Sequence, residues 1–278
     1  MNADMALKEP TAQMENMSLI LDLERYPIDR PDSPAAQALL ARCRADLKSE
    51  GLFNLDNLVR PHVIARCAAE AQPRLNSESY HHKRRHNVYF QREVEGLAPD
   101  HPALRLVDSD NHTLCADQVA GSIVDWIYRW QPLVNFLAAA LEMPRLHLME
   151  DPLASINVIS YRAGEALNWH FDRSHFTTTL LMQSPEIGGE FQYCRDLRSD
   201  SNPNYEGVAR LLRGENSDIR TLPVTPGTLN VFKGKNTLHR VSPPSGNRDR
   251  IIAVLSYYDR PGVVFSSEER LGFYGRAN

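Results

Sequence analysis

Apolar residues in the first half of the chain recur every three or four positions, which is the spacing of one face of an amphipathic helix. This spacing predicts a helix over residues 34–49, with Ser33 as its N-cap and Gly51 at its end. It predicts a second helix over residues 61–71, opened by Pro61. Helices with one apolar stripe usually pack on the outside of a sheet, so we interpret both as structural.

The strongest helical pattern covers residues 116–141, where one long helix is predicted to support the sheet. Trp126 and Trp130 follow its apolar stripe, which indicates core residues and not binding residues. Gly121 and Pro132 interrupt the run and are the positions at which we expect a bend.

From about residue 146 the pattern changes to short stretches of β-branched and aromatic residues separated by turn residues, which is typical of a β-sandwich or barrel. The clearest strands are predicted at residues 156–161, 177–182 and 251–258. Residues 195–220 are polar and rich in turn formers, and are predicted to be an insertion with a short helix near its end.

Other segments lack a clear period. Residues 1–18 are expected to be frayed, whereas Leu19–Leu23 is predicted to be a short strand or an anchor on the core. Residues 72–112 are predicted to be rich in loops, with Val88–Phe90 as their one strand-like piece. The expected organisation is a helical N-terminal region (1–145) that packs on and lids the core, a catalytic core (146–262) and a C-terminal tail (263–278).

Composition narrows the classes of function. The 278 residues are 42% hydrophobic and 24% charged, as in globular proteins with a real core, and the net charge of −4 argues against nucleic acid as a partner. We interpret the basic run His81–His86 as a solvated loop, or as a loop that presents one arginine to a small anion, in preference to an electrostatic patch. The four cysteines show no C-x-x-C spacing, and no secretory leader or run of eighteen apolar residues is present, so a reduced, cytoplasmic protein without membrane association is expected. The sequence gives no indication of oligomeric state.

The candidate chemistry is a metal site. His170 and Asp172 are two residues apart, so a strand places both side chains on one face. His239 follows after enough chain for several strands, and is predicted to complete the set. Two imidazoles and one carboxylate that leave three coordination positions open form the triad of non-haem Fe(II) oxygenases.

Further motifs stand in a fixed order around this triad. They are Tyr161-x-x-Gly164, His170-x-Asp172, Gly188-Gly189-Glu190, Pro226-Gly227-x-Leu229-x-x-Phe232, His239 and Arg250. In the order and spacing of these motifs the chain resembles the Fe(II)/2-oxoglutarate-dependent dioxygenase superfamily over about residues 150–260. The resemblance implies a mainly β fold with flanking helices, namely a double-stranded β-helix (jelly-roll or cupin-like) core with an α-helical N-terminal part. It also implies Fe(II), 2-oxoglutarate and O2 as cofactors, and hydroxylation of an unactivated C–H bond with release of succinate and CO2.

A planar, bidentate cation suits the distal carboxylate of 2-oxoglutarate. Arg250 is the first candidate because it opens the strand after His239 and is expected to point inward together with Ile252. Arg248 is the alternative, in the same turn and on the same face. Tyr161 and Asn157, four residues apart on one strand face, are predicted to line the cosubstrate pocket.

The stretch from Leu167 to Ser174 and the late Leu271–Arg276 segment resemble a narrower group, the bacterial free-amino-acid hydroxylases and halogenases that act on lysine, ornithine and similar substrates. Halogenases of this group have glycine at the carboxylate position of the triad, which leaves a coordination site for chloride. Asp172 stands at that position here. The resemblance therefore implies a hydroxylase that acts on a small molecule. Two alternatives stay open: the same chemistry on a carrier-bound or peptide substrate, and a catalytically silent β-helix protein that only binds metal or ligand.

A free amino acid needs an arginine for its carboxylate and an acid for its ammonium group. An acid directly after the triad carboxylate would suit a cationic side chain, but Arg173 occupies that position, which puts lysine in doubt. The candidate substrate-binding residues are Arg84, Arg85, Asn87, Tyr89, Glu150, Asp151, Glu165 and Arg173.

Overall fold

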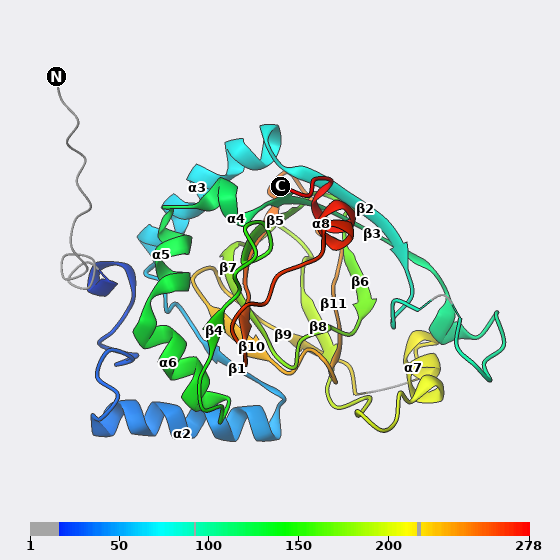
Figure 1. The fold of residues 1–278 in the computed structure, drawn as a ribbon, viewed down its shortest axis with the longest axis horizontal. Coiled ribbons are helices and arrows are strands. Elements are labelled where there is room, and N and C mark those ends of the chain that lie inside the picture. The colour runs from blue at the N-terminus through cyan, green and yellow to red at the C-terminus, as the bar shows by residue number, and fades with distance from the viewer. Residues whose placement is uncertain (1–16, 92, 216–217) are drawn as a thin grey trace.

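The computed structural model describes residues 17–91, 93–215 and 218–278 (Figure 1). Within these residues the largest element is a seven-stranded sheet in which all neighbouring strands are antiparallel. In spatial order its strands are β1 (Leu52–Leu55), β10 (Leu229–Phe232), β7 (Thr177–Gln183), β12 (Arg250–Leu255), β5 (Ile156–Tyr161), β3 (Val107–Leu114) and β2 (Tyr80–His86).

A smaller antiparallel sheet faces the middle of the large one. Its strands are β6 (Leu167–His170), β11 (Leu238–Val241), β8 (Phe191–Cys194) and β9 (Arg220–Leu222). A two-stranded pair of β13 (Tyr257–Tyr258) with β4 (His147–Leu148) completes the strands of the described chain. Residues from both main sheets line one cavity between them. The predicted double-stranded β-helix core is therefore confirmed.

Alternation along the central strands sends successive side chains to opposite faces of the large sheet. In β12, Ile251 and Ala253 are fully buried toward the helices, whereas Arg250 and Ile252 line the cavity between the sheets. In β5, Val158 faces the helices in the same way. The period of two thus separates a purely structural face from the face that carries candidate chemistry.

Helices cover the outer face of the large sheet (Figure 1). The helix α2 (Pro34–Ser49) begins after Ser33, whose side chain accepts a hydrogen bond from the Ala36 amide, as predicted. The helix α3 (Pro61–Ser77) packs on β7 through Ile64 and Cys67, but it is longer than predicted. It continues to Ser77 with Pro73 inside it.

The single helix predicted over residues 116–141 is wrong. The chain forms α4 (Ala116–Val119), α5 (Ile123–Arg129) and α6 (Gln131–Ala140). Gly121 adopts a left-handed φ of 76° between the first two, and Trp130 is extended before the N-terminal Pro132 of α6. As a result Trp130 is buried but Trp126 is 42% exposed. The prediction of a core residue is confirmed for Trp130 and wrong for Trp126.

Residues 72–112 contain more regular structure than predicted. The basic run His81–His86 belongs to β2, which pairs with β3 and extends the large sheet. Exposure alternates along the strand: His81, Lys83 and Arg85 are exposed, whereas His82, Arg84 and His86 are partly or fully buried. The outward face of a strand can therefore solvate this polar run without a loop. Val88–Phe90 is a turn, not a strand, and Phe90 has a φ of 56°.

Leu19–Leu23 is an anchor, as one of the two predictions had it: Leu21 is fully buried and bridges to Val59. The 195–220 segment carries α7 (Tyr205–Leu212), close to the predicted helix. The prediction for residues 1–18 lies almost wholly outside the described residues. In the C-terminal tail α8 (Ser267–Tyr274) packs against β2, far away in sequence (Figure 1).

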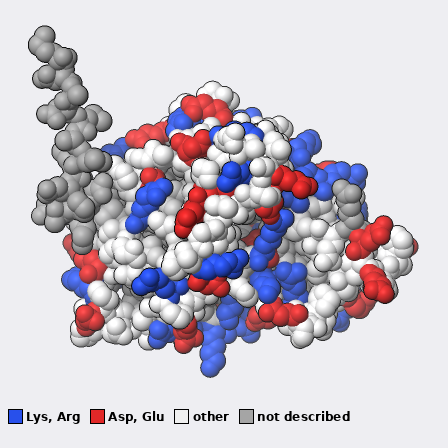
Figure 2. Space-filling model, viewed as in Figure 1, with Lys and Arg blue, Asp and Glu red and all other residues white. Residues whose placement is uncertain are grey.

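Two surface properties bear on the classes of partner. Lysine and arginine side chains are interspersed with aspartate and glutamate over the face shown in Figure 2, so this face has no large basic patch. In the described part of the chain, no helix has both the length and the apolar character required to cross a bilayer.

Candidate active site

The three predicted metal ligands converge at one end of the cavity between the sheets. His170 closes β6 and lies directly opposite His239 of β11 in the strand register. The two imidazole centroids are therefore 4.2 Å apart. Asp172 follows just past the end of β6, with its carboxylate oxygens 3.3 Å from His170 Nε2 and 3.5 Å from His239 Nε2.

Backbone carbonyls orient both imidazoles. His170 Nδ1 is 2.8 Å from the carbonyl oxygen of Asn168, and His239 Nδ1 is 3.0 Å from that of Thr237. Each Nδ1 therefore carries the proton and donates, which leaves both Nε2 lone pairs free for a metal ion. Burial lowers the pKa of His239 to about 4, which keeps this ring neutral at physiological pH.

Asp172 is held ionised in a tight space. Burial alone would raise the pKa of its carboxyl group, but His239, His170 and the Thr177 hydroxyl together hold that pKa well below its usual value. The Thr177 hydroxyl donates to Asp172 Oδ2. A Cβ atom on Gly234 would lie 2.3 Å from the same oxygen, so only glycine leaves room for the carboxylate there.

A buried hydrogen-bond chain supports the triad from β2 and β3. The Ser109 hydroxyl donates to His86 Nε2 over 2.6 Å and accepts from the Asn168 amide over 3.1 Å. The Asn168 carbonyl in turn fixes His170. Burial lowers the pKa of His86 to about 4, which suits its role as the acceptor.

The inner cavity extends from the triad between the two sheets and encloses about 140 Å³. Its walls are mostly apolar, and Arg250 lies among them, 3% exposed. The Arg250 Nε donates to the Gly189 carbonyl over 2.9 Å, but its Nη1 is buried and has no hydrogen-bond partner among the described residues. Burial lowers the pKa of this guanidinium to about 10, so it stays charged at neutral pH.

A buried, charged and half-satisfied guanidinium calls for an anion. Tyr161 lines the same cavity, and its ring lies 5.9 Å from the Arg250 guanidinium carbon. The geometry accordingly suits a small carboxylate that reaches from the triad to Arg250, as 2-oxoglutarate does in the superfamily.

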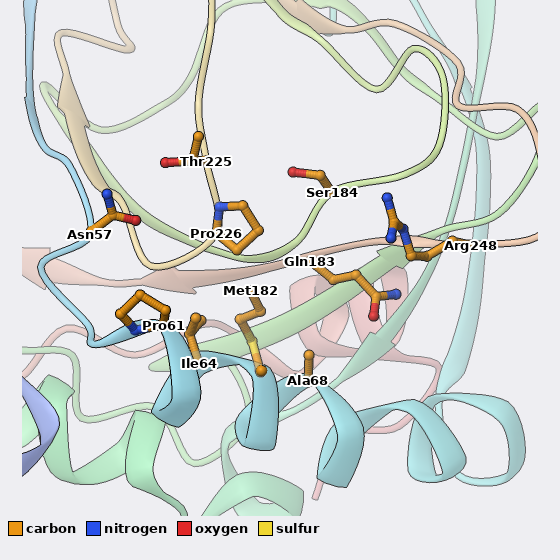
Figure 3. Close-up of a pocket in the computed structure, with 11 residues that line it drawn as sticks. Asn57, Pro61, Ile64, Ala68, Met182, Gln183, Ser184, Thr225, Pro226 and Arg248 are labelled. Carbon is orange, nitrogen blue, oxygen red and sulfur yellow. The ribbon is translucent and has the colours of Figure 1, made fainter.

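The other two residues predicted for the cosubstrate lie elsewhere. Arg248 is exposed and lines a surface pocket between α3 and the sheet, on the outer side of the molecule (Figure 3). Its guanidinium is hydrogen-bonded to the Pro185 carbonyl. The alternation of the strand begins only at Arg250, so a turn residue two positions earlier does not share its direction. Asn157 lines the outer cavity described below and not the inner one, and its side chain accepts a hydrogen bond from Tyr274.

A second, outer cavity of about 300 Å³ opens on the other side of the triad and shares His170 and Asp172 with the inner one. Its walls come from β2, β3, β5 and the C-terminal segment that contains α8. Arg84 and Arg173 both line it, as predicted for substrate binding.

The remaining predicted substrate residues have structural partners outside this cavity. Arg85 points away and pairs with Asp108. The Asn87 side chain accepts from the amides of its own turn, and the Tyr89 hydroxyl donates to the Pro203 carbonyl. The three acids are engaged too: Glu150 accepts from the Gly262 amide, Asp151 from Arg270 and nearby amides, and Glu165 contacts His112 and the Arg162 amide.

Several wall residues escaped sequence analysis because their neighbours are set by tertiary contacts. His82 comes from a run predicted as a loop and Phe90 from the piece predicted to be strand-like, whereas Phe273 and Tyr274 come from a tail predicted to lie outside the core. The alternation of His82, Arg84 and His86 is the signal that could have identified a strand face in the basic run.

A second group of potential metal ligands lies on the outer side of the β2–β3 pair. His81, His112 and Glu165 bring ligand atoms within 4.8 Å of one another, as the triad does. However, His81 contacts Asp110, and His112 contacts Glu165 at 3.1 Å, so these groups satisfy one another. They line neither cavity described above. Of the two groups found among the described residues, the triad is the one that combines free imidazole lone pairs with an adjoining cavity.

Comparison with known protein families assigns the chain to a family. A family profile described as Halogenase D matches residues 35–263, which include the triad, Arg250 and most of the outer cavity. The chain belongs to the halogenase D family. Membership agrees with the predicted resemblance to a group that includes halogenases; the narrower assignment to amino-acid hydroxylases remains a prediction. No curated protein matches the chain at a significant level.

Solved structures similar to this halogenase D family member share its fold at low sequence identity. One is the non-haem α-ketoglutarate-dependent epimerase SnoN from nogalamycin biosynthesis, with a TM-score of 0.55 and 14% identity, covering 80% of this chain and 82% of that one. Another is AviO1 from Streptomyces viridochromogenes, with a TM-score of 0.54, 16% identity and coverages of 80% and 96%. A third, HygX from Streptomyces hygroscopicus, was solved with nickel and 2-oxoglutarate bound; its TM-score is 0.51, its identity 12%, and the coverages are 78% and 85%.

The chain is therefore a member of an enzyme family named for a halogenase, and it shares the fold of solved α-ketoglutarate-dependent and 2-oxoglutarate-bound proteins. Fe(II), 2-oxoglutarate and O2, the cofactors expected from the sequence, agree with that fold.

Proposed function

We propose that this chain is a hydroxylase that uses Fe(II), 2-oxoglutarate and O2 to oxidise an unactivated C–H bond of a free amino acid or a similar small polar molecule. The observation that carries the proposal is the carboxylate of Asp172, within 3.5 Å of both imidazole Nε2 atoms. Halogenases of the group that the sequence resembles have glycine there. A third protein ligand favours hydroxylation over halogenation.

Each residue has a distinct task in this proposal. His170, Asp172 and His239 would hold the iron, which with O2 and 2-oxoglutarate supplies the oxidation of the C–H bond and releases succinate and CO2. Arg250 would bind the distal carboxylate of 2-oxoglutarate through its free Nη1. The apolar wall of the inner cavity excludes water from that ion pair and so strengthens it.

The outer cavity supports a small substrate. At about 300 Å³ it accommodates an amino acid, and β2 and α8 flank it where a peptide or carrier domain would need an open groove. The alternative of a silent binding protein does not account for the intact combination of three ligands with a buried, half-satisfied Arg250.

The test is an aerobic incubation with Fe(II), 2-oxoglutarate, ascorbate, chloride and a panel of free amino acids, with succinate and product mass measured together. We expect one amino acid to gain a single oxygen atom in step with succinate. A product that gains chlorine would overturn the hydroxylase proposal. Iron binding without any succinate would favour the silent protein.

A variant pair tests the ligand assignment. Asp172→Gly should abolish hydroxylation, because it removes the only carboxylate of the triad. The matched control is Glu165→Gln, which alters the second His-carboxylate group and should leave both iron stoichiometry and hydroxylation unchanged. Full hydroxylation by the Asp172→Gly variant would refute the triad.

A further inference from the structure

The charged side chains in the wall of the outer cavity, next to the triad, are mostly cationic. Its charged wall residues, within the described chain, are Arg84, Arg173 and Asp172. The carboxylate of Asp172 accepts a hydrogen bond from the Thr177 hydroxyl and lies within 3.5 Å of both imidazole Nε2 atoms, as a member of the triad that would hold the metal. The wall therefore offers two guanidinium groups to a ligand and no carboxylate that is free to bind one.

The aromatic ring of Phe273 brings the two guanidinium groups together. Their central carbons each lie 5.6 Å from its centroid, although the arginines come from β2 and from the loop after β6. Arg84 also lies 4.6 Å from the Phe90 centroid. Stacking on ring faces fixes the plane of a guanidinium and leaves its N–H edge free to donate.

The two arginines differ in what neutralises them. No hydrogen bond or ion pair to another described residue engages Arg84, which is half-buried. Arg173 pairs with Glu269 of α8 over 2.6 Å, and the other Glu269 oxygen accepts from the Ser266 amide in the helix cap. Glu269 is thus already used twice and is not available to an incoming cation.

From this arrangement we infer that the substrate is an amino acid that carries a second anionic group, with Arg84 and Arg173 each taking one anion. The inference rests on the proposed function, which it narrows from a small polar molecule to an anionic one. A cationic side chain would meet two like charges and no free acid, and like-charge contacts in a partly desolvated site cost affinity. Carboxylate and phosphate are both suitable for a guanidinium, so the test includes one amino acid with each.

The test measures equilibrium binding by calorimetry, without O2, to the protein loaded with Fe(II) and saturated with 2-oxoglutarate. The ligands are L-glutamate, L-aspartate, O-phospho-L-serine, L-glutamine, L-asparagine and L-lysine. We expect at least one of the three anions to bind about tenfold or more tightly than glutamine or asparagine, the scale of one charge-assisted hydrogen bond. Lysine should bind weakest.

Variants then assign the selectivity. Arg173→Gln should reduce the preference for the anion over its amide to near unity, and should strengthen lysine binding because Glu269 is released. Arg84→Gln should weaken every amino acid of the panel. Arg85→Gln, on the outward face of the same strand, is the matched control and should change nothing.

The outcomes separate this inference from the proposed function. If lysine or the amides bind as tightly as the anions, or if Arg173→Gln leaves the preference intact, the inference is wrong; hydroxylation of lysine would then still support the hydroxylase. If an anionic amino acid binds in an Arg173-dependent manner but aerobic incubation yields no oxidised product, the inference stands and the hydroxylase fails. Absence of binding by all six compounds would overturn the inference.

Discussion

At the scale of single residues, the site depends on space and on orientation as much as on ligand identity. The triad imidazoles are oriented by carbonyls two residues before each histidine, so the same strands that carry the ligands also fix their tautomers. The Asp172 carboxylate fits because Gly234, in the turn before β11, has no side chain.

Gly234→Ala should therefore damage the metal site. Its Cβ would lie 2.3 Å from Asp172 Oδ2 and 2.8 Å from the Thr177 hydroxyl, so the carboxylate must move. We expect Fe(II) affinity to fall by about tenfold or more, the usual effect of disturbing groups around a ligand. Gly272→Ala is the control, because nothing lies within 4 Å of its added Cβ and its backbone is helical. Equal Fe(II) affinity in both variants would contradict the packing argument.

Arg250→Ala should raise the concentration of 2-oxoglutarate needed for half-maximal binding by about 10- to 100-fold, because hydrogen bonds to charged groups contribute about 1.5–3 kcal/mol. Calorimetry of the iron-loaded protein measures this directly. Arg248→Ala should leave 2-oxoglutarate binding unchanged, since that side chain is exposed on the outer surface (Figure 3). The reverse result would move the carboxylate site to Arg248.

At the scale of elements, local capping and breaking signals decided where helices begin and end. Ser33 caps α2 as its sequence predicts, whereas the apolar periodicity over residues 116–141 continued across two breaks. Periodicity reports which face is buried, but Gly121 and Pro132 set the backbone path. The apolar stripe thus identified the buried side of this segment, but the prediction of a single continuous helix was wrong.

The Ser33 cap should contribute measurably to the free energy of unfolding. Ser33→Ala removes the acceptor for the Ala36 amide and should lower that free energy by about 1 kcal/mol, the typical value for an N-cap. Chemical unfolding monitored by circular dichroism gives the difference. Ser77→Ala serves for comparison, because the exposed Ser77 hydroxyl only donates back to the Pro73 carbonyl, and it should have little effect. Equal losses in the two variants would contradict the capping role.

At the scale of the whole molecule, three distant segments meet at the outer cavity: the β2–β3 pair, the loop after β6 and the C-terminal α8. Their packing buries His86, whose folded-state pKa of about 4 lies below the value near 6.5 expected in the unfolded chain.

This difference predicts that the metal-free protein loses stability as the pH falls from about 6.5 toward 4. In that window the unfolded chain binds a proton at residue 86 that the folded chain does not, so the free energy of unfolding decreases by up to about 1.4 kcal/mol per pH unit from this group. His86→Gln should reduce the slope, measured by urea unfolding at a series of pH values. The matching replacement of His62, exposed on α3, should preserve it. An unchanged slope in His86→Gln would show that this ring binds protons equally in the folded and unfolded states.

The sequence by itself determined the β-rich core, the positions of its central strands and the convergence of His170, Asp172 and His239. These follow from local rules: period-two alternation, turn residues and the limited choice of side chains that bind iron. Arg250 was the first candidate from the sequence and Arg248 the alternative; only the structure separates them, because Arg250 lines the inner cavity and Arg248 lies on the surface.

Only the tertiary structure decided what surrounds that centre. Period and composition do not reveal that β2 adds to the large sheet, that Phe273 of the tail stacks on Arg84, or that Asp151 and Glu165 are consumed by structural partners. Each depends on which segments meet in space, since a charged residue has the same local pattern whether it binds a ligand, a neighbour or water. Metal-binding residues can be recognised from their short-range spacing in the sequence. The wall of a substrate cavity, in contrast, is formed by contacts between residues that are far apart in the chain.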